Sequence, residues 1–485
     1  MQVRIVDDLL HPGEAKRAEA VLNACVHCGF CTATCPTYLQ GGNELDSPRG
    51  RIYLIKEMFE TGEASEITRT HLDRCLTCLS CETTCPSGVE YHKLVALGRA
   101  TSERLAPRSL AQKSLRFLLR NLMVTRGLFP ALIALGRPFA ALLPETLRRV
   151  YFPRRDRPAE SPAGSPSAEP AAKTAVAATV EPAEPAPLLP GIEEGKAEGK
   201  TEGKVLLVRG CVQPSLRPQT DAAFVRILKA LAVPVEESAA ANCCGAASFH
   251  TSGEEQARSL ARTQVDYWWQ RLSEEPLRAI VSTASGCGVH IKDYATVLAD
   301  DPEYCQRAEQ IVSLVRDPVE VLEQVFDQLQ VFEQVAEQDL EKHRHLKRGR
   351  NLEAGIEQQP QGATAAESAS RFVFHCPCTL QHGQGLSGRV EQLLGRLGFK
   401  LPAVEDAHLC CGSAGTYSVL QPSTARALRA EKLERLQAGN PKVILTANIG
   451  CQLHLQGGTE TPVRHWLEVV ADLLEEGGRK NSVAS

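Results

Sequence analysis

Two stretches of the sequence, ACVHCGFCTATCPTY at residues 24–38 and RCLTCLSCETTCPSG at residues 74–88, repeat one pattern of four cysteines followed by a proline. The spacing in both is C-x2-C-x2-C-x3-C-P. Its short gaps allow three sulfur atoms to converge on one point, and the proline ends the local turn and directs the chain away. The cysteines are Cys25, Cys28, Cys31 and Cys35 in the first stretch and Cys75, Cys78, Cys81 and Cys85 in the second.

This spacing binds two cubane iron-sulfur clusters in bacterial ferredoxins, where the fourth cysteine of each run is a ligand of the other cluster. We therefore expect one [4Fe-4S] cluster on Cys25, Cys28, Cys31 and Cys85, and a second on Cys75, Cys78, Cys81 and Cys35. Structural zinc would explain the C-x2-C pairs, but neither the third cysteine of each run nor the repeated ending. A chain with two such clusters is predicted to transfer electrons.

The composition indicates a cytoplasmic protein of several domains. With 485 residues the chain can form about two to four domains. Its formal net charge of -4 gives no reason to expect nucleic acid as a partner. The opening residues, MQVRIVDDLLHPGEAK, carry acids and a proline where a secretory signal needs an apolar core. The 18 cysteines are therefore interpreted as metal ligands and not as the disulfides of a secreted protein.

Residues 1–103 are predicted to form a mostly helical, ferredoxin-like domain that holds both clusters. Between the two cysteine runs, residues 48–72 have helical apolar spacing, which predicts a helical insertion. The residues on its apolar side are Ile52, Ile55, Met58 and Phe59.

The next segment, residues 104–157, is strongly basic, with twelve lysines or arginines against Glu145 and Asp156, a net charge of +10. Pieces such as SLAQKSLRFLLRNL are amphipathic, which favours docking on anionic lipid or on an acidic partner subunit. The alternative is a set of short helices that cover the cluster domain and expose solvated arginines. The apolar stretch from Leu122 to Leu143 is interrupted by charges and prolines well short of the roughly 20 residues that a spanning helix needs. We expect no membrane-spanning helix there.

Residues 158–203 have no apolar periodicity. They are rich in Pro and Ala and end in the charged repeat GKAEGKTEGK. Such a segment cannot bury enough apolar surface to offset chain entropy, so it is predicted to be a disordered linker. The cysteine-rich front and the remaining chain are then separate folding units.

The second half of the chain contains an internal repeat. The strings KVLLVRGC, CCG and TASGCGVH in the first copy correspond to RFVFHCPC, CCG and TANIGCQLH in the second. The first cysteine and the CCG pair are 32 positions apart in both copies, and the CCG pair and the last cysteine are 43 and 40 positions apart. The candidate site residues are Cys211, Cys243, Cys244, Cys287 and His290 in the first copy, and Cys378, Cys410, Cys411, Cys451 and His454 in the second.

Both copies alternate predicted strands and helices. The runs KVLLVR, AIVSTAS, RFVFH and KVILTAN are short, apolar and β-branched, as buried strands are. We therefore predict two CCG domains, at residues 204–325 and 370–480, each with an open and mostly parallel sheet and with its cysteines beyond the strand ends. The whole chain is predicted to be an α+β multidomain protein, with a helical cluster domain, a linker and duplicated α/β domains.

Each CCG domain can bring four thiolates to one place. Adjacent cysteine side chains diverge in extended backbone, so the CCG glycine is expected to turn the chain sharply. Soft thiolates in that number favour an iron-sulfur or zinc site over a hard ion, and a thiol-based redox centre is the alternative. Cys305 and Cys376 have no counterparts in the repeat, and we assign them no role.

The chain resembles the iron-sulfur subunits of bacterial glycolate oxidase. Strings that carry the resemblance include ACVHCGFCTATCPTY, ELDSPRGRIYLIK (residues 44–56), HCPCTLQH (375–382) and HLCCGSAGTY (408–417). The wider group with paired CCG domains includes the small subunit of anaerobic glycerol-3-phosphate dehydrogenase, lactate-utilisation proteins and heterodisulfide reductase subunits. The resemblance covers nearly the whole chain except the linker and a Gln/Glu-rich stretch at residues 326–369, which we interpret as insertions.

The resemblance implies a division of labour. FAD-containing partner subunits would oxidise glycolate to glyoxylate, and this chain would pass the electrons toward a quinone-type acceptor. No G-x-G-x-x-G fingerprint opens a βαβ unit and no P-loop occurs in the sequence, so we expect no flavin in this chain. The expected activity is that of an oxidoreductase subunit for a CH-OH donor, with an acceptor other than NAD or oxygen. The expected location is the cytoplasm, peripherally on the inner face of the plasma membrane.

Two other functions stay open. The same electron carrier could serve a lactate or glycerol-3-phosphate dehydrogenase, because the substrate would bind to another subunit. The other is a disulfide reductase whose CCG clusters form the active site. In heterodisulfide reductases the CCG module ends in C-x2-C, whereas here His290 and His454 replace the last cysteine, which argues against that activity. Imidazole ligates iron in Rieske centres, so both histidines are candidate ligands.

Overall fold

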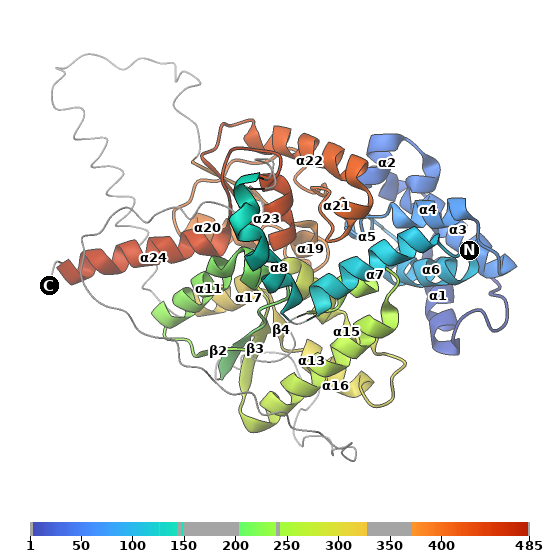
Figure 1. Cartoon of the computed structure of the whole chain (residues 1–485), viewed down its shortest axis with the longest axis horizontal. Coiled ribbons are helices and arrows are strands. Elements are labelled where there is room, and N and C mark those ends of the chain that lie inside the picture. The colour runs from blue at the N-terminus through green and yellow to red at the C-terminus, as the bar shows by residue number, and fades with distance from the viewer. Residues whose placement is uncertain are drawn as a thin grey trace.

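The computed structural model describes residues 3–142 except residue 126, together with Arg148 and residues 203–238, 243–326 and 371–483. The predicted linker at 158–203 lies outside these ranges except for Gly203, and the predicted insertion at 326–369 lies outside them except for Phe326. Figure 1 shows the N-terminal helices on the right and two α/β domains beside them, one drawn in green and yellow and one in orange and red. The predicted α+β organisation is confirmed.

The N-terminal domain is helical. Its elements are α1 (Pro12–Ala24), η1 (Phe30–Thr32), α2 (Pro36–Gly41), η2 (Glu44–Asp46), α3 (Pro48–Thr61), α4 (Glu66–Asp73), α5 (Ser80–Thr83) and α6 (Tyr91–Leu105). Helices α1 and α3 both pack on α6 around an apolar core. The two cysteine runs lie between helices of this core, so the packed helices fix the positions of the thiols.

Residues 48–73, between the cysteine runs, form the two helices α3 and α4. The Ser47 hydroxyl caps α3, which ends at Gly62 with a left-handed φ of 71°. The Ser65 hydroxyl then caps α4. The four residues of the predicted apolar side, Ile52, Ile55, Met58 and Phe59, are at most 3% exposed. A capped amphipathic helix thus fills the space between the two cluster motifs, as its spacing predicts.

The first α/β domain has a four-stranded sheet in the order β2-β1-β3-β4, with parallel pairing throughout. Its strands are β1 (Lys204–Leu207), β2 (Val235–Glu237), β3 (Leu277–Val281) and β4 (Val315–Arg316). Its helices are α10 (Gln213–Leu216), α11 (Pro218–Ala230), α12 (Ala246–Phe249), α13 (Glu254–Glu274), α14 (Ser285–Lys292), α15 (Tyr294–Val297), α16 (Cys305–Val312) and α17 (Pro318–Phe326). The long helix α13 packs on α12 and α16.

The second α/β domain has a three-stranded parallel sheet in the order β5-β6-β7. Its strands are β5 (Phe372–His375), β6 (Val443–Thr446) and β7 (Val463–His465). Its helices are α19 (Cys378–Gln381), α20 (Arg389–Arg396), α21 (Tyr417–Leu420), α22 (Pro422–Gln437), α23 (Ile449–Gln456) and α24 (Trp466–Val483). The predicted parallel sheets are therefore present in both copies.

The two α/β domains share one apolar core. Buried residues of β1, β3, α11 and α17 and of β5, β6, α20 and α24 form a single cluster. Helix α11 packs along α24, and the two helices lie side by side on the left of Figure 1. The His465 imidazole Nε2 contacts the Thr283 carbonyl at 3.0 Å across this boundary. The two copies of the repeat are thus packed together around one core, with a cysteine site in each.

The basic segment forms α7 (Leu110–Val124), α8 (Leu128–Gly136) and η3 (Arg137–Leu142). Part of its charge is buried, because Arg108 Nη2 donates to Asp73 at 2.8 Å and Arg116 lies 3.1 Å from the same carboxylate. Burial alone would raise the pKa of Asp73, but the Arg108 hydrogen bond and the two positive charges lower it. The arginines thus tie α7 to the cluster domain, and α7 exposes apolar side chains such as Phe117 and Leu118.

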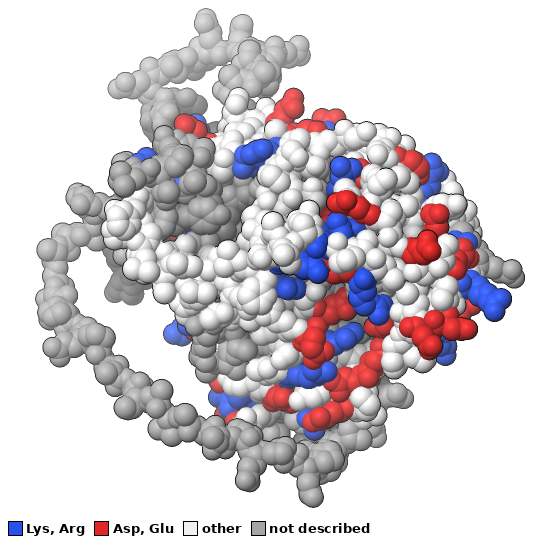
Figure 2. All heavy atoms as spheres, turned by 45° about the vertical axis from the view of Figure 1, so that its right-hand side comes forward, with Lys and Arg blue, Asp and Glu red and all other residues white. Residues whose placement is uncertain are grey.

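No single helix of the described residues is long and apolar enough to cross a bilayer. Helix α7 and the segment 128–140 reach the required length and hydropathy only when taken together, and the chain bends by 94° between them. Figure 2 shows the face on the side of the N-terminal domain, and acidic and basic side chains are interspersed on it. That face has no large area of a single charge, in agreement with the small net charge of the chain.

Candidate metal centres

The two cysteine runs adopt the same backbone conformation. In the first run His27 and Gly29 have left-handed φ values of 56° and 85°, and in the second run Thr77 and Leu79 have φ values of 51° and 63°. These are the second and fourth residues after the first cysteine of each run. Alternating left-handed residues wind the short loop tightly, so that its thiols point to one side. Leu79 adopts a conformation that side chains with a Cβ disfavour, which indicates that the surrounding fold holds the loop in place.

The structure brings the eight cysteines together in two groups. One cavity is lined by Cys25, Cys28, Cys31 and Cys85, and it also touches Cys81. A second cavity is lined by Cys35, Cys75, Cys78 and Cys81. The last cysteine of each run therefore lies with the first three of the other run, which is the crossed arrangement expected from the spacing. We call these cavities site one and site two.

The residues of both sites fit an iron-sulfur cluster. The Tyr91 side chain lines both cavities, is 4% exposed, and has a hydroxyl with no hydrogen-bond partner among the described residues. Burial raises the pKa of the Cys31 thiol to about 11 and that of the Cys78 thiol well above its ordinary value. Buried thiols of this kind give up their protons when a metal takes their place. The donor set is thus suited to metal binding and not to free thiolate chemistry.

A buried arginine stands beside site two. Arg51 is 1% exposed, and its Nη1 lies 4.0 Å from Cys35 Sγ. Its other groups donate to the His71 carbonyl at 2.8 Å and to the Thr37 hydroxyl at 3.1 Å. Burial alone would lower the pKa of Arg51, but the negative charges of Cys75, Tyr91, Cys35 and Asp46 raise it. A permanent positive charge therefore faces the thiolates of site two.

In the first α/β domain the four predicted cysteines come together. Cys211 lies after β1, Cys243 and Cys244 precede α12, and Cys287 lies in α14. The neighbouring Cys243 thiol raises the pKa of Cys211, and the neighbouring Cys244 thiol raises that of Cys287. The four thiols thus form one cluster, as the repeat predicts.

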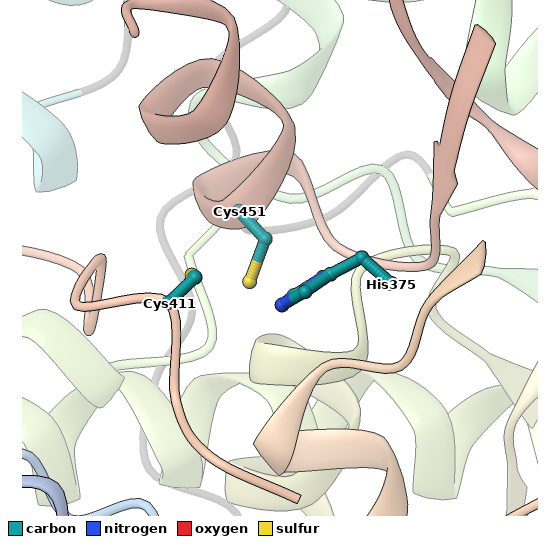
Figure 3. A group of neighbouring side chains, drawn as sticks. All are labelled: His375, Cys411 and Cys451. Atoms are coloured by element: carbon teal, nitrogen blue, oxygen red, sulfur yellow. The ribbon is translucent and has the colours of Figure 1, made fainter. Parts of the chain in front are cut away.

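The second α/β domain gathers its four cysteines in the same way. Cys378 Sγ lies 3.8 Å from Cys410 Sγ, and Cys411, the next residue after Cys410, has its Sγ within 4.8 Å of Cys451 Sγ. The domain also brings in a residue that the repeat does not single out. His375, at the end of β5, has a ring nitrogen that lies with Cys411 Sγ and Cys451 Sγ in a group whose ligand atoms are all within 4.8 Å of one another (Figure 3).

The CCG glycines are required in both domains. Gly245 and Gly412 have left-handed φ values of 88° and 85°. A Cβ at Gly412 would lie 2.7 Å from the Ala425 carbonyl oxygen of α22, and a Cβ at Gly245 would lie 3.2 Å from the Ala257 carbonyl oxygen of α13. The glycine therefore provides both the turn expected from sequence and a close approach of the cysteine loop to a helix.

The two predicted histidines lie in different surroundings. His454 Nε2 is 3.1 Å from the Ala425 carbonyl oxygen, so this nitrogen is directed at the backbone of α22. His290 is buried among aromatic rings, with centroids 5.3 Å from Phe249 and 5.7 Å from Tyr294. His375 is the residue that sequence reasoning missed. Aligning the copies could have revealed it, because the position three residues before the first cysteine is Val208 in one copy and His375 in the other.

Site two adjoins the second α/β domain. Cys78 packs in one cluster with Cys378 and Cys410, together with Leu76 and Tyr417. The Tyr417 hydroxyl donates to the Arg74 carbonyl at 3.2 Å, and the Thr83 hydroxyl lies 2.9 Å from His382 Nδ1. Sites one and two share Cys81 and Tyr91 in their walls. The three groups of sulfur ligands therefore form a contiguous series through the molecule.

Comparison with known proteins agrees with this arrangement. Residues 21–89 match the family described as 4Fe-4S dicluster domain, and residues 205–292 and 372–456 each match the family described as cysteine-rich domain. The chain therefore binds two [4Fe-4S] clusters, and the cysteine-rich domains suggest an additional centre.

Relatives match over the whole chain or over part of it. The chain is 41% identical over 476 residues to the glycolate oxidase iron-sulfur subunit of Escherichia coli (strain K12), covering 98% of this chain and all of that protein. It is 26% identical to the probable glycolate oxidase iron-sulfur subunit of Bacillus subtilis (strain 168), over 96% of both chains. It is 22% identical to lactate utilization protein A of an Exiguobacterium strain, over 56% of this chain and 97% of that protein.

Proposed function

The chain belongs to the family of glycolate oxidase iron-sulfur subunits, and from this premise we propose that it carries electrons from a glycolate-oxidising flavin subunit toward a membrane quinone. It is an iron-sulfur electron-transfer subunit of an oxidoreductase. The observation that carries the proposal is the contiguous series of sulfur sites, in which sites one and two share a wall and site two adjoins Cys378 and Cys410.

The ligand assignment follows the two cavities. Cys25, Cys28, Cys31 and Cys85 would hold the cluster of site one, and Cys75, Cys78, Cys81 and Cys35 would hold that of site two. When bound, these clusters accept and release electrons singly. The tightly wound loops hold the thiols in place, and the apolar core beneath them excludes water from one side of each site.

Site one is the proposed entry point. Cys28 is exposed, and its neighbours Val26 and Phe30 expose 67% and 63% of their surfaces. Exposed apolar residues around a redox site favour contact with another protein, because burial of such residues drives association. An FAD-containing partner that covers Val26 and Phe30 would bring its cofactor toward site one. Oxidation of glycolate to glyoxylate would take place on that partner.

Site two is the proposed exit toward the cysteine-rich half. Cys75 is buried and Cys78 is only partly exposed, and the second α/β domain covers the side of the site where Cys378 and Cys410 lie. A docking flavin subunit therefore has access to site one, while site two faces the chain's own next sulfur ligands. This polarity gives the electron path a direction.

The membrane contact is assigned to α7 and α8. Phe117, Leu118, Leu132 and Leu135 are exposed apolar residues of these helices, and Phe139 of the following η3 is exposed as well. Lys113 lies on the same helix as Phe117, so the surface combines apolar and basic side chains. Such a surface binds at the interface of a membrane with anionic headgroups. We propose that the protein lies in the cytoplasm, against the inner face of the plasma membrane, where a quinone is accessible.

The proposal is tested in the complex with its flavin partner. Cys31→Ala removes a ligand of site one, so glycolate should still reduce the flavin while quinone reduction falls by at least tenfold. The matched control is Cys305→Ala, which changes a partly exposed thiol far from both sites in sequence. Unchanged quinone reduction in Cys31→Ala would contradict the electron path. Equal rates of quinone reduction with lactate and with glycolate would contradict the assignment of glycolate as the substrate.

A further inference from the structure

We propose that His375 is a nitrogen ligand of a redox-active iron centre in the second α/β domain, beside Cys411 and Cys451. The same domain holds Cys378 and Cys410 within one contiguous group of thiols. The centre would therefore have mixed sulfur and nitrogen ligation. Its role as an electron acceptor after site two rests on the function proposed above, whereas the ligation itself does not.

The strand pairing directs the imidazole. His375 on β5 and Thr446 on β6 are partners in the parallel register. Their side chains meet, with His375 Nδ1 3.1 Å from Thr446 Oγ1. With Nδ1 donating its proton to the hydroxyl, Nε2 carries the free lone pair, which is the tautomer that binds a metal through Nε2. The hydrogen bond of Nδ1 with Thr446 thus fixes the orientation of the ring, as is usual for metal-ligating histidines.

The other ring nitrogen, Nε2, lacks a hydrogen-bond partner within the described part of the chain. His375 is 2% exposed, and its Nε2 is buried without a hydrogen-bond partner among the described residues. Cys411 and Cys451 are 1% and 4% exposed, and Figure 3 shows the His375 ring edge and the Cys451 sulfur directed at one another, with Cys411 beside them. A buried polar atom without a partner is costly, and a metal between the nitrogen and the two sulfurs would satisfy it.

The first α/β domain lacks the nitrogen. Val208 occupies the position of His375, and Ala284 occupies the position of Asn448. In the second domain, Asn448 Nδ2 donates to Cys451 Sγ at 3.6 Å, and Asn448 Oδ1 accepts from the Gly286 amide of the first domain at 3.3 Å. Asn448 is held by the Gly286 amide of the first domain, and its own hydrogen bond to Cys451 therefore fixes the position of the Cys451 sulfur. The two cysteine sites are thus chemically unequal, although their cysteines are in register.

Mixed ligation has a consequence for electron flow. Replacing thiolate by neutral imidazole removes negative charge and raises the reduction potential of an iron centre, as in Rieske clusters. Cys378 and Cys410 of this domain pack against Cys78 of site two. An electron acceptor of raised potential would therefore lie immediately after site two, and the second domain would receive electrons before the first.

The test uses the full-length protein, purified anaerobically, with ¹⁵N-labelled histidine. Pulsed EPR should detect nitrogen hyperfine coupling to an iron centre distinct from the two cubane clusters. In His375→Val, which installs the residue of the first copy, the coupling should disappear while the cubane signals and their iron content stay unchanged. His375→Cys should lose the coupling and keep the iron, which separates loss of a nitrogen ligand from loss of folding. His454→Gln is the matched control and should keep the coupling.

Three results would overturn the assignment. They are a nitrogen coupling that persists in His375→Val, iron in the second domain of the unsubstituted protein without any nitrogen coupling, and zinc in place of iron at this site. Loss of the cubane signals together with an intact nitrogen-coupled centre would contradict the function proposed above and would leave the His375 assignment standing.

Discussion

The positive charge of Arg51 beside site two should set the reduction potential of its cluster. The perturbation is Arg51→Met, which removes the charge and keeps a long apolar side chain in the core. Arg51 Nη1 lies 4.0 Å from Cys35 Sγ, and the side chain is 1% exposed. Because the charge favours the added electron, its loss makes reduction harder, and the potential should fall.

The size of the fall follows from the distance. At an effective dielectric constant of about 20, two unit charges about 4 Å apart interact by ~4 kcal/mol, and ~2.3 kcal/mol corresponds to about 100 mV, which gives an upper limit of roughly 170 mV. The added electron is shared over the whole cluster, so its mean distance from Arg51 is greater. We expect a fall of roughly half that limit, about 80 mV.

The assay is an EPR-monitored redox titration of the full-length protein under anaerobic conditions. Arg51→Lys keeps the charge and should keep most of the potential. The matched control at site one is Arg49→Met, because Arg49 also lines a cluster cavity and has a carboxylate partner, Glu44, as Arg51 has Asp46, but its side chain is 37% exposed and that of Arg51 only 1%. Solvent screening should make its effect much smaller. A potential that is unchanged or raised in Arg51→Met would refute the reasoning.

Three further predictions concern stability, pH and membrane binding. Gly412→Ala should lower the free energy of unfolding by about 1–2 kcal/mol because the residue has a left-handed backbone, and by more because its Cβ would meet the Ala425 carbonyl. The control is Gly439→Ala, which should have a smaller effect because the space around Gly439 is open. Equal chemical denaturation curves for the two variants would contradict this. Burial raises the pKa of Asp317 to about 7, opposed by the Val319 amide and Lys292 and assisted by the negative charge of Glu320, so the folded state holds the proton more tightly than the unfolded chain. The free energy of unfolding should then fall by about 1.4 kcal/mol per pH unit as the pH rises from roughly 4 to 7, and Asp317→Asn should remove this pH dependence. Denaturation curves of the variant at several pH values that keep the same pH dependence would disprove the prediction. Phe117→Ser should reduce binding to anionic vesicles about tenfold in a flotation assay, since burial of one such side chain contributes roughly 1.5–3 kcal/mol; unchanged flotation would exclude α7 as the contact.

The features that were predictable from sequence are those encoded in short spacings. The C-x2-C-x2-C-x3-C-P runs define their own loops, and the structure places Cys85 with the first run and Cys35 with the second. The CCG glycine was predictable because adjacent cysteines need a sharp turn, and both glycines have positive φ. The strands were predictable from their β-branched runs, and the parallel sheets followed from alternation with helices.

The features that were not predictable depend on contacts between distant segments. His375 looks like one polar residue at a strand end until β5 pairs with β6 and brings Thr446 beside it. The approach of Cys78 to Cys378 depends on how the helical domain packs on the second α/β domain, which no local pattern encodes. Whether the arginines of the basic segment are solvated or paired was also not predictable, because Asp73, which pairs with Arg108 and Arg116, lies in another helix.

The central claim is that the cysteine sites form one electron path through the chain. The most direct test is EPR of the dithionite-reduced full-length protein, with iron, zinc and acid-labile sulfide measured in the same sample. We expect two reduced [4Fe-4S] clusters whose signals are broadened by magnetic coupling to each other, because sites one and two share Cys81 and Tyr91 in their walls. Zinc without iron and sulfide, or two cluster signals without any mutual coupling, would contradict it.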